Sequence, residues 1–185
     1  MFIEVIILSL IVGFILKGSI KNFKDVDLKH IELIFIGFAV ETTLVILIRQ
    51  GIILDNTIVY AFHMLMYIML FIFIYLNKKM YQILIMGAGF FLNALAIFTN
   101  GGVMPVGSDA AIKAGMSNII NSISNEGLYK LVDNNTIFPF LCDVIPKPYP
   151  RAFVISAGDI FIAIGLFLLI LNFMGCRKLG KKKEN

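Results

Sequence analysis

Residues 80–106, "MYQILIMGAGFFLNALAIFTNGGVMPV", decide the fold because a long apolar run ends there in an abrupt polar turn. An α-helix over 80–99 rises about 1.5 Å per residue, which is enough to cross a hydrocarbon layer about 30 Å thick. The Asn-Gly-Gly that follows adopts positive φ easily, and the proline after it favours extended backbone at the preceding residue. The stretch therefore predicts a membrane-spanning helix that ends in a sharp reversal of the chain.

The rest of the chain is apolar in the same way. Hydrophobic residues make up 59% of the 185 residues and charged residues 15%, and the mean hydropathy is +0.90. Soluble domains average about 45–50% apolar residues and about 25% charged residues. The start, Met1-Phe2-Ile3-Glu4, is acidic and no signal-peptide cleavage site follows, so we expect the first run to remain as a helix. The expected fold class is an all-α membrane protein, one integral membrane domain over 1–185, with five transmembrane helices at about 2–16, 31–48, 58–76, 80–99 and 152–174.

Lysine and arginine gather on alternate connections between these runs and predict the orientation. Basic residues are retained on the cytoplasmic side, so we expect the N-terminus outside, the C-terminus inside and a multi-pass protein of the plasma membrane. The net charge of +4 is then an orientation signal, and no nucleic-acid partner is expected. The tail either anchors the last helix or contacts anionic lipid. The basic residues are Lys17, Lys21, Lys24, Lys29, Lys78, Lys79, Arg177, Lys178, Lys181, Lys182 and Lys183, against Arg49 alone on the second connection.

The long segment 100–151 is expected to form an ordered extracytoplasmic cap. Ser108-Asp109 is typical of a helix start, and the pattern after it predicts one amphipathic helix at the outer interface. Residues 136–151, "TIFPFLCDVIPKPYPR", contain four prolines and are too irregular for a helix, but they are apolar enough to pack on the helices. The positions at helical spacing are Ala111, Ile112, Gly115, Met116, Ile119, Ile120 and Ile123.

Polar side chains recur at one depth in four of the predicted helices. At 1.5 Å per residue, Glu41, His63, Asn93 and Asp159 each lie about 8–10 Å below the outer end of their run. A carboxylate in hydrocarbon is costly unless it is paired or protonated, and the expected partner of both acids is His63. The inner half of the helices is nearly free of ionisable groups. The pattern predicts a polar cup that opens outward rather than a pore.

Each member of this layer also has a purely structural explanation. Asn93 can make an interhelical hydrogen bond, and a lone His63 can be a packing residue. An Asp, a Glu and a His can hold a divalent metal, but their spacing matches no metal motif, and neither CxxC nor a His-rich pattern occurs, so no metal is expected. Cys142 and Cys176 are expected on opposite sides, so no intramolecular disulfide is predicted. The sequence does not indicate which cofactor the protein uses, if any.

The glycine turn after the fourth run has two interpretations. It either offers free backbone N–H groups to an anion or is a plain turn, and Asp109 beside it disfavours an anion. The candidate binding residues combine this turn, the polar layer, one residue of the cap and the serine one turn from Asp159. They are Glu41, His63, Asn93, Asn100, Gly101, Gly102, Asp143, Ser156 and Asp159.

Three stretches together resemble a known family: "LNALAIFTNGGVMPV" (92–106), "DVIP" (143–146) and "SAGD" (156–159). They resemble small bacterial multi-pass membrane proteins of unknown function, marked by Asn-Gly-Gly-x-Met-Pro-Val and Ser-x-Gly-Asp. The resemblance implies the fold and the membrane location, and it implies no activity. The family pattern has a neutral amide where this chain has Glu41, so that carboxylate is not a general requirement of the family. The motif positions are Asn100, Gly101, Gly102, Met104, Pro105, Asp143, Pro146, Ser156, Gly158 and Asp159.

Three functions fit these observations. The first is a binding or accessory membrane protein whose polar site opens to the extracytoplasmic side. The second is an intramembrane enzyme that acts on a lipid or prenyl carrier through Asp143, Asp159, His63 or Glu41 as acid–base groups. The third is a small proton-coupled transporter with Glu41 and Asp159 carrying protons. The expected partners are membrane lipid and either another membrane protein or further copies of the chain, and whether the protein is an enzyme stays open.

Overall fold

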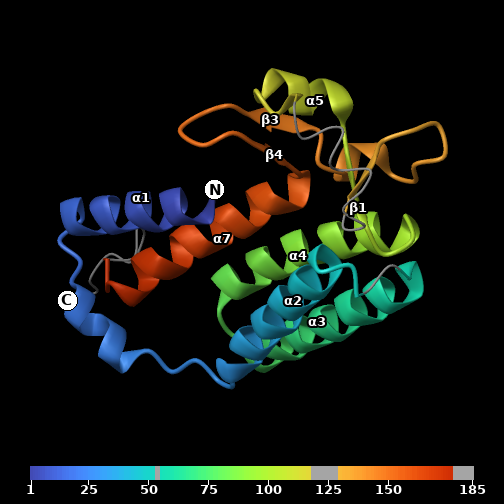
Figure 1. Cartoon of the computed structure of the whole chain (residues 1–185). Helices are drawn as coiled ribbons and strands as arrows, with labels where there is room; N and C mark the ends of the chain where they lie inside the picture. Colours follow the sequence, from blue (N-terminus) through green and yellow to red (C-terminus); the bar gives the residue numbers. More distant parts are fainter. Residues whose placement is uncertain (53–54, 118–128, 177–185) are drawn as a thin grey trace.

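The computed structural model describes residues 1–52, 55–117 and 129–176 of the chain (Figure 1). The described part is mostly helical, as predicted, and apolar helices occupy the five predicted positions. The last of them begins later than residue 152, because residues 153–155 belong to a strand instead. The long helices are α1 (Phe2–Ile15), α2 (Glu32–Arg49), α3 (Asn56–Leu76), α4 (Tyr81–Thr99) and α7 (Ala157–Phe173).

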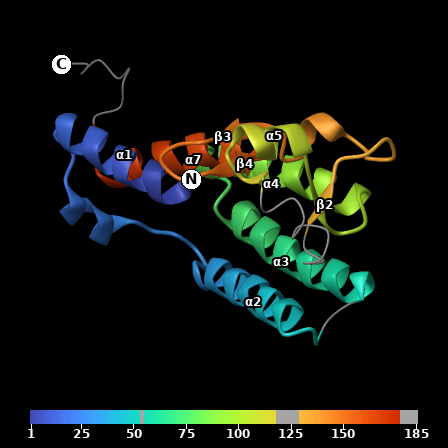
Figure 2. The same cartoon turned by 45° about the horizontal axis from the view of Figure 1, so that its top comes forward.

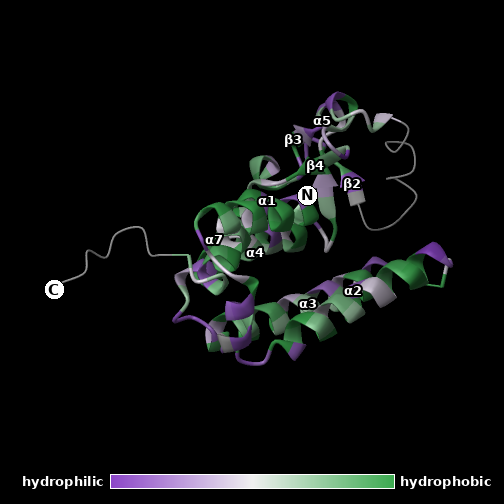
Figure 3. Cartoon of the chain, turned by 90° about the vertical axis from the view of Figure 1, so that its left-hand side faces the viewer, coloured by the Kyte–Doolittle hydropathy of each residue, from purple (hydrophilic) through white to green (hydrophobic). Residues whose placement is uncertain are grey.

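The five helices pack as a row rather than as a closed ring. Helix α1 contacts α7, α7 packs extensively on α4, α4 contacts α3, and α3 packs on α2 (Figures 1 and 3). The crossing of α4 and α7 depends on Gly89 and Gly158. A Cβ on either glycine would clash with the other's carbonyl oxygen. Small residues let helix backbones approach this closely, which is the usual way in which helices pack without a hydrophobic driving force.

The outward faces of the helices are apolar. Helices α3 and α4 are long and apolar enough to cross a membrane, while α1 and α7 are apolar but shorter. Only 28% of the most apolar window of α3 and 44% of that of α4 is buried inside the protein. Figure 3 shows hydrophobic residues along the length of these helices. Large exposed side chains include Ile7, Leu8, Ile11, Phe14, Phe35, Phe38, Leu65, Ile68 and Phe91.

The lysine-bearing connections lie together at one end of the helices, here called the basic end. After α1, the chain forms the 3₁₀ segment η1 (Ile20–Asp25) (Figure 2). This segment lies against the C-terminal end of α7, where Ser19 N and Asn22 Nδ2 both donate to Met174 O at 2.8 Å. The apolar core at this end joins Phe73, Ile83 and Leu169 from α3, α4 and α7.

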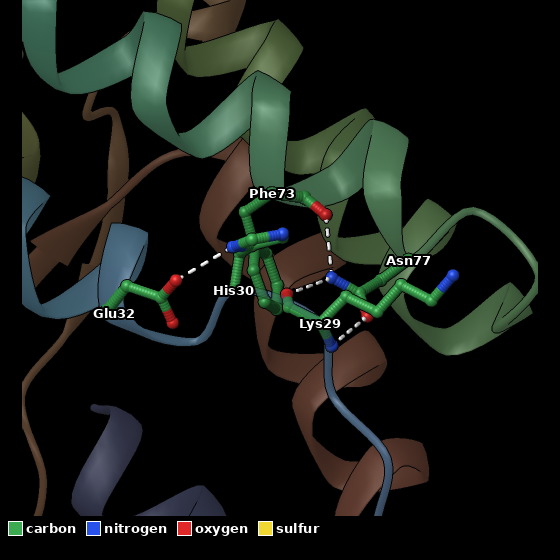
Figure 4. Close-up of polar contacts among 5 residues, drawn as sticks. All are labelled: Lys29, His30, Glu32, Phe73 and Asn77. Carbon is green, nitrogen blue, oxygen red and sulfur yellow. Dashed lines mark hydrogen bonds and ion pairs between the residues drawn. The ribbon is translucent and has the colours of Figure 1, made fainter.

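Asn77 fastens the connection before α2 to the C-terminal end of α3. Its Oδ1 accepts from Lys29 N at 2.9 Å, and its Nδ2 donates to the carbonyl oxygens of Lys29 and Phe73, each at 2.9 Å (Figure 4). Asn77 is buried, and these bonds use both its donor and its acceptor atom. His30 and Glu32, 2.8 Å apart beside it, are exposed. The residue therefore aligns the basic ends of α2 and α3.

The cap covers the opposite end of the row, and its described part is ordered, as predicted. Strand β1 (Met104–Val106) pairs in parallel with β2 (Tyr129–Leu131), and β3 (Ile145–Lys147) pairs antiparallel with β4 (Phe153–Ile155). The 3₁₀ turn η2 (Pro139–Leu141) lies between these pairs. The sequence analysis predicted no strands here, and β4 replaces the outer end of the predicted fifth span.

The amphipathic helix of the cap is shorter than predicted. Helix α5 runs over Ser108–Lys113 and ends because Gly115 takes φ +82°, with Met116 N donating back to Ala111 O at 2.8 Å. This pattern is a glycine-dependent helix stop. The positions beyond it that extended the predicted helix, Ile119, Ile120 and Ile123, lie outside the described residues.

Candidate functional site

A cavity of about 460 Å³ lies between the cap and the outer parts of the helices. All five long helices contribute to it, together with β1, β4 and the segment after η2. One part of the wall is apolar and includes Val45, Met66, Ile97, Met104, Phe153 and Val154. The polar lining residues are Glu41, His63, Tyr67, Asn93, Asp143 and Asp159. Five of these six were predicted as site residues, and the structure brings them to one cavity.

His63 joins α3 to α2 and to the glycine turn. The ring is 5% exposed, with Nδ1 2.6 Å from Gly102 O and Nε2 3.4 Å from Glu41 Oε2. A carbonyl oxygen only accepts, so Nδ1 must carry hydrogen and donate. Nε2 then faces a carboxyl group, and one proton must lie on one of these two atoms for the contact to be attractive. The predicted proximity of Glu41 and His63 is confirmed.

The glycine turn positions His63 and does not offer an open anion site. Gly101 and Gly102 take φ +84° and +87°, and a Cβ on Gly102 would lie within 2.9 Å of Tyr60 backbone and side-chain atoms. The backbone N–H groups of Asn100 and Gly102 both donate to Ile97 O, at 3.1 and 2.9 Å. Since those donors are used within the chain, the plain-turn interpretation is the one that the geometry supports.

Asn100 connects this turn to the cap. Its Nδ2 donates to Ala96 O at 2.7 Å and to Ile137 O at 2.8 Å, and its Oδ1 accepts from Ile137 N at 2.9 Å. The side chain is buried and does not line the cavity. Asn100 and Gly101 were predicted as binding residues, but neither lines the cavity: Asn100 holds the turn against the cap, and Gly101 is exposed.

Asn93, Ser156 and Asp159 form a closed hydrogen-bond network at the crossing of α4 and α7. Asn93 Nδ2 donates to Asp159 Oδ1 at 3.0 Å, and Ser156 Oγ donates to Asn93 Oδ1 at 2.7 Å. Ser156 and Asp159 also form a capping box, in which Ser156 Oγ accepts from Asp159 N at 2.9 Å and Asp159 Oδ2 accepts from Ser156 N at 3.2 Å. The predicted partner of Asp159, His63, is wrong, because α7 begins at Ala157 and places Asp159 in its first turn.

Asp143 enters the cavity from the cap with its backbone held on both sides. Asp143 N donates to Pro105 O at 3.0 Å and Asp143 O accepts from Gly107 N at 2.8 Å. Among the described residues, the buried Oδ1 atom has no hydrogen-bond partner. Burial, with the nearby charge of Asp159 as a smaller cause, raises the pKa of Asp143 to about 8.

Tyr67 is the polar lining residue that sequence reasoning missed. It is 5% exposed, and its hydroxyl lies close enough to Asp159, Glu41 and Asp143 to feel all three charges. A signal was available, since Tyr67 follows His63 by four residues on α3 and such residues share a helix face. An ion pair was missed as well: Lys147 of β3 contacts Glu4 of α1, and the amino terminus lies 4.0 Å from the same carboxylate.

The site shows no familiar catalytic constellation within the described residues. Ser156 is bonded to Asn93 and to the start of α7 and not to a base, so it lacks the arrangement of an activated nucleophile. No three His, Cys, Asp or Glu side chains of the described ranges gather closely enough to hold a metal ion. Cys142 is buried in the cap and Cys176 lies beside Gly13 near the basic end, and both are free thiols. The arrangement is one of polar groups that surround a cavity.

Fold and site thus define a class: a mostly helical protein with apolar outer faces and a polar cavity beneath a small cap. Comparison of the sequence identifies the group. The chain belongs to a family of unknown function, DUF5317, which matches residues 25–171. It is also similar to an uncharacterized protein of Thermotoga maritima, 29% identical over 174 residues that cover 92% of this chain and 90% of the relative. No solved structure matches the chain. The resemblance to a family without known activity is confirmed.

Proposed function

We propose that this protein is an integral membrane protein of the plasma membrane that binds a small ligand or headgroup in the cavity beneath its cap. In this proposal the five long helices span the bilayer, the basic end faces the cytoplasm and the cap faces outward. The observation that carries the proposal is a cavity of about 460 Å³ in which the buried Asp143 Oδ1 has no partner among the described residues and the buried Glu41 Oε2 has no hydrogen bond, only a 3.4 Å contact with His63.

The surface of the helices supports the membrane location. Soluble monomers rarely expose contiguous apolar patches larger than a few hundred Å², whereas here apolar side chains are exposed on every long helix. The distribution of charge agrees, because lysines gather on the connections at one end of the row and the cap covers the other. Under the positive-inside rule this arrangement favours an extracytoplasmic cap.

The polarity of the cavity supports binding. A layer with a purely structural role would satisfy its own hydrogen bonds. Here Glu41 Oε2 has only the 3.4 Å contact with His63, and Asp143 Oδ1 has no partner within the described ranges. Leaving a buried polar atom unpaired costs about 1–3 kcal/mol. A ligand that donates hydrogen bonds would recover this free energy, which favours a site over a structural layer.

The same observations give less support to the two alternatives. A transporter needs a polar route toward the basic end, but there the interior is filled by Phe73, Ile83 and Leu169. An enzyme needs a nucleophile or an acid–base pair aimed at a reacting atom. The Glu41–His63 pair is the nearest approach to one in the described residues. A binding protein requires neither a polar route through the helices nor a catalytic pair.

Native mass spectrometry of protein purified in a mild detergent tests the proposal. Met66 lines the cavity, whereas the adjacent Leu65 is 45% exposed on the outer face of α3. We expect wild type and Leu65→Trp to retain a bound small molecule or lipid, and Met66→Trp to lose it because the indole fills the cavity. Equal retention by both variants, or no retained molecule in wild type, would contradict a ligand site here.

A further inference from the structure

The cavity contains more acid than base. Three carboxyl groups line it, those of Glu41, Asp143 and Asp159, against the imidazole of His63 and the amino terminus of Met1. That amino terminus lies 4.0 Å from Glu4, which Lys147 also contacts, and neither Glu4 nor Lys147 is part of the lining. The charge balance therefore favours a positively charged occupant over an anion.

Hydrogen bonding points the same way. The amide of Asn93 is used, since its Nδ2 donates to Asp159 and its Oδ1 accepts from Ser156. In the described lining, the buried atoms left over are acceptors: Asp143 Oδ1 without a partner and Glu41 Oε2 with a single long contact. The donor left over at this end of the described chain, Lys147 Nζ, lies outside the lining and against Glu4. Tyr67 is 5% exposed, and its hydroxyl lies close enough to all three carboxyl groups to feel their charges. The occupant that these atoms fit is a donor.

We propose that the cavity binds a primary ammonium group that carries a short apolar chain. This inference rests on the proposed binding function and deepens it. A primary ammonium offers three N–H donors and a full positive charge, which suits unpaired carboxyl oxygens. The apolar wall, with Met66, Ile97 and Phe153, accommodates the attached carbons, and an aromatic ring also attracts a cation. Two sources supply this chemistry: a free alkylamine and the ethanolamine headgroup of a lipid.

Binding measurements on the full-length protein in a neutral maltoside detergent test the proposal. The probes are hexylamine, the neutral hexanol, the anionic hexanoate and a lyso-phosphatidylethanolamine, titrated by calorimetry at pH 8. We expect hexylamine to bind at least about tenfold more tightly than hexanol, as one charge-assisted pair predicts. Tighter binding of the lyso-lipid than of hexylamine would identify the lipid headgroup as the source, and the reverse order a free amine.

Matched variants locate the effect. Asp143→Asn keeps the shape of the side chain and removes the charge, and we expect it to weaken hexylamine about tenfold or more. Asp109→Asn makes the same change at an exposed cap position outside the cavity and should bind like wild type. If Asp143→Asn does not fold, Glu41→Gln serves instead, and we again expect weaker binding of hexylamine.

The outcomes separate the two proposals. Equal binding of hexylamine and hexanol, preference for hexanoate, or an Asp143→Asn affinity equal to that of wild type would overturn the ammonium inference. The binding function would survive any of these results if native mass spectrometry still showed a molecule that Met66→Trp excludes. Absence of both amine binding and a retained molecule would overturn both.

Discussion

Two carboxyl groups of the same cavity differ in how completely the protein satisfies them. Asp159, at the start of α7, accepts hydrogen bonds at both oxygens, from Asn93 Nδ2 at 3.0 Å and from Ser156 N at 3.2 Å. Asp143, from the cap, has a buried oxygen without a partner in the described ranges. The two residues teach that a shared location does not imply a shared role. The Asp159 side holds helices together, and in our proposal the Asp143 side receives the ligand.

The largest effect is expected on the Asp159 side, from Gly158→Val. A side chain at this position meets Asn93 and the carbonyl oxygen of Gly89 on α4. Overpacking at such a crossing destabilises by about 3 kcal/mol or more, so we expect the yield of folded protein in detergent to fall sharply by size-exclusion chromatography. Ala163→Val on the same helix is the control. If Gly158→Val were as well folded as this control, the close contact of α4 and α7 would not exist.

The next largest effect concerns the Asp143 side, where a substitution is expected to stabilise the protein. The pKa of Asp143 is about 8 in the folded protein against an ordinary value of 3.8. Between about pH 4 and about pH 8 the folded state keeps a proton that the unfolded state releases, so the contribution of Asp143 to stability falls as the pH rises through this window. Asp143→Asn should therefore raise the free energy of unfolding at pH 8.5 by about 2 kcal/mol, which corresponds to a thermal midpoint about 4–8 °C higher.

At pH 3 the same substitution should leave the midpoint nearly unchanged, because Asp143 is then protonated in the folded state and mostly protonated in the unfolded state. Variant and wild type share the other groups of the lining, Glu41, His63, Tyr67 and Asp159, so the difference between the two proteins reports on Asp143. A variant that is less stable than wild type at pH 8.5 would show that this carboxylate is already paired.

A smaller loss is expected from Ser156→Ala. The hydroxyl caps α7 and bonds to Asn93, and loss of a helix cap costs about 0.5–2 kcal/mol. We expect a lower thermal midpoint with the affinity for hexylamine unchanged, since Ser156 does not line the cavity. A Ser156→Ala protein of normal stability that binds amine poorly would reverse the roles assigned to the two sides.

The smallest effect is expected from Tyr67→Phe. The ring that packs among Phe71 and Phe98 stays, and only the hydroxyl near the carboxyl groups is removed. Loss of one neutral hydrogen bond corresponds to about 1 kcal/mol, or about fivefold in the affinity for hexylamine. Calorimetry that shows no change would place the hydroxyl outside the ligand's reach.

The sequence predicted the helices better than it predicted the partners of their polar residues. Long apolar runs marked the long helices, and depth along a helix correctly brought Glu41 toward His63. The expected partner failed for Asp159: it lines the same cavity as Glu41 and His63, but its hydrogen bonds go to Asn93 and Ser156. The partner depends on how α7 crosses α4 and on the start of α7 at Ala157, and no local sequence pattern specifies either.

Single residues account for the other differences. Gly115 stops α5 where helical spacing continued, since backbone conformation overrides the apolar pattern. Asn100 and Gly101 carry a distinctive motif, yet neither lines the cavity: Asn100 bonds the turn to the cap, and Gly101 is exposed. Tyr67 resembles any core aromatic in the sequence, and only its position one turn from His63 identifies it. Motif residues and lining residues therefore overlap only in part.

The central claim is that the Asp143 side is a cation site reached from outside the cell, and cysteine labelling of intact cells tests it most directly. Met66→Cys is introduced after Cys142 and Cys176 are replaced by alanine, and a cationic trimethylammonium-ethyl methanethiosulfonate is compared with its anionic sulfonatoethyl analogue. We predict labelling without lysis, at least about tenfold faster for the cation, with the preference reduced by Asp143→Asn. Labelling only after the membrane is permeabilised, or faster labelling by the anion, would contradict the account.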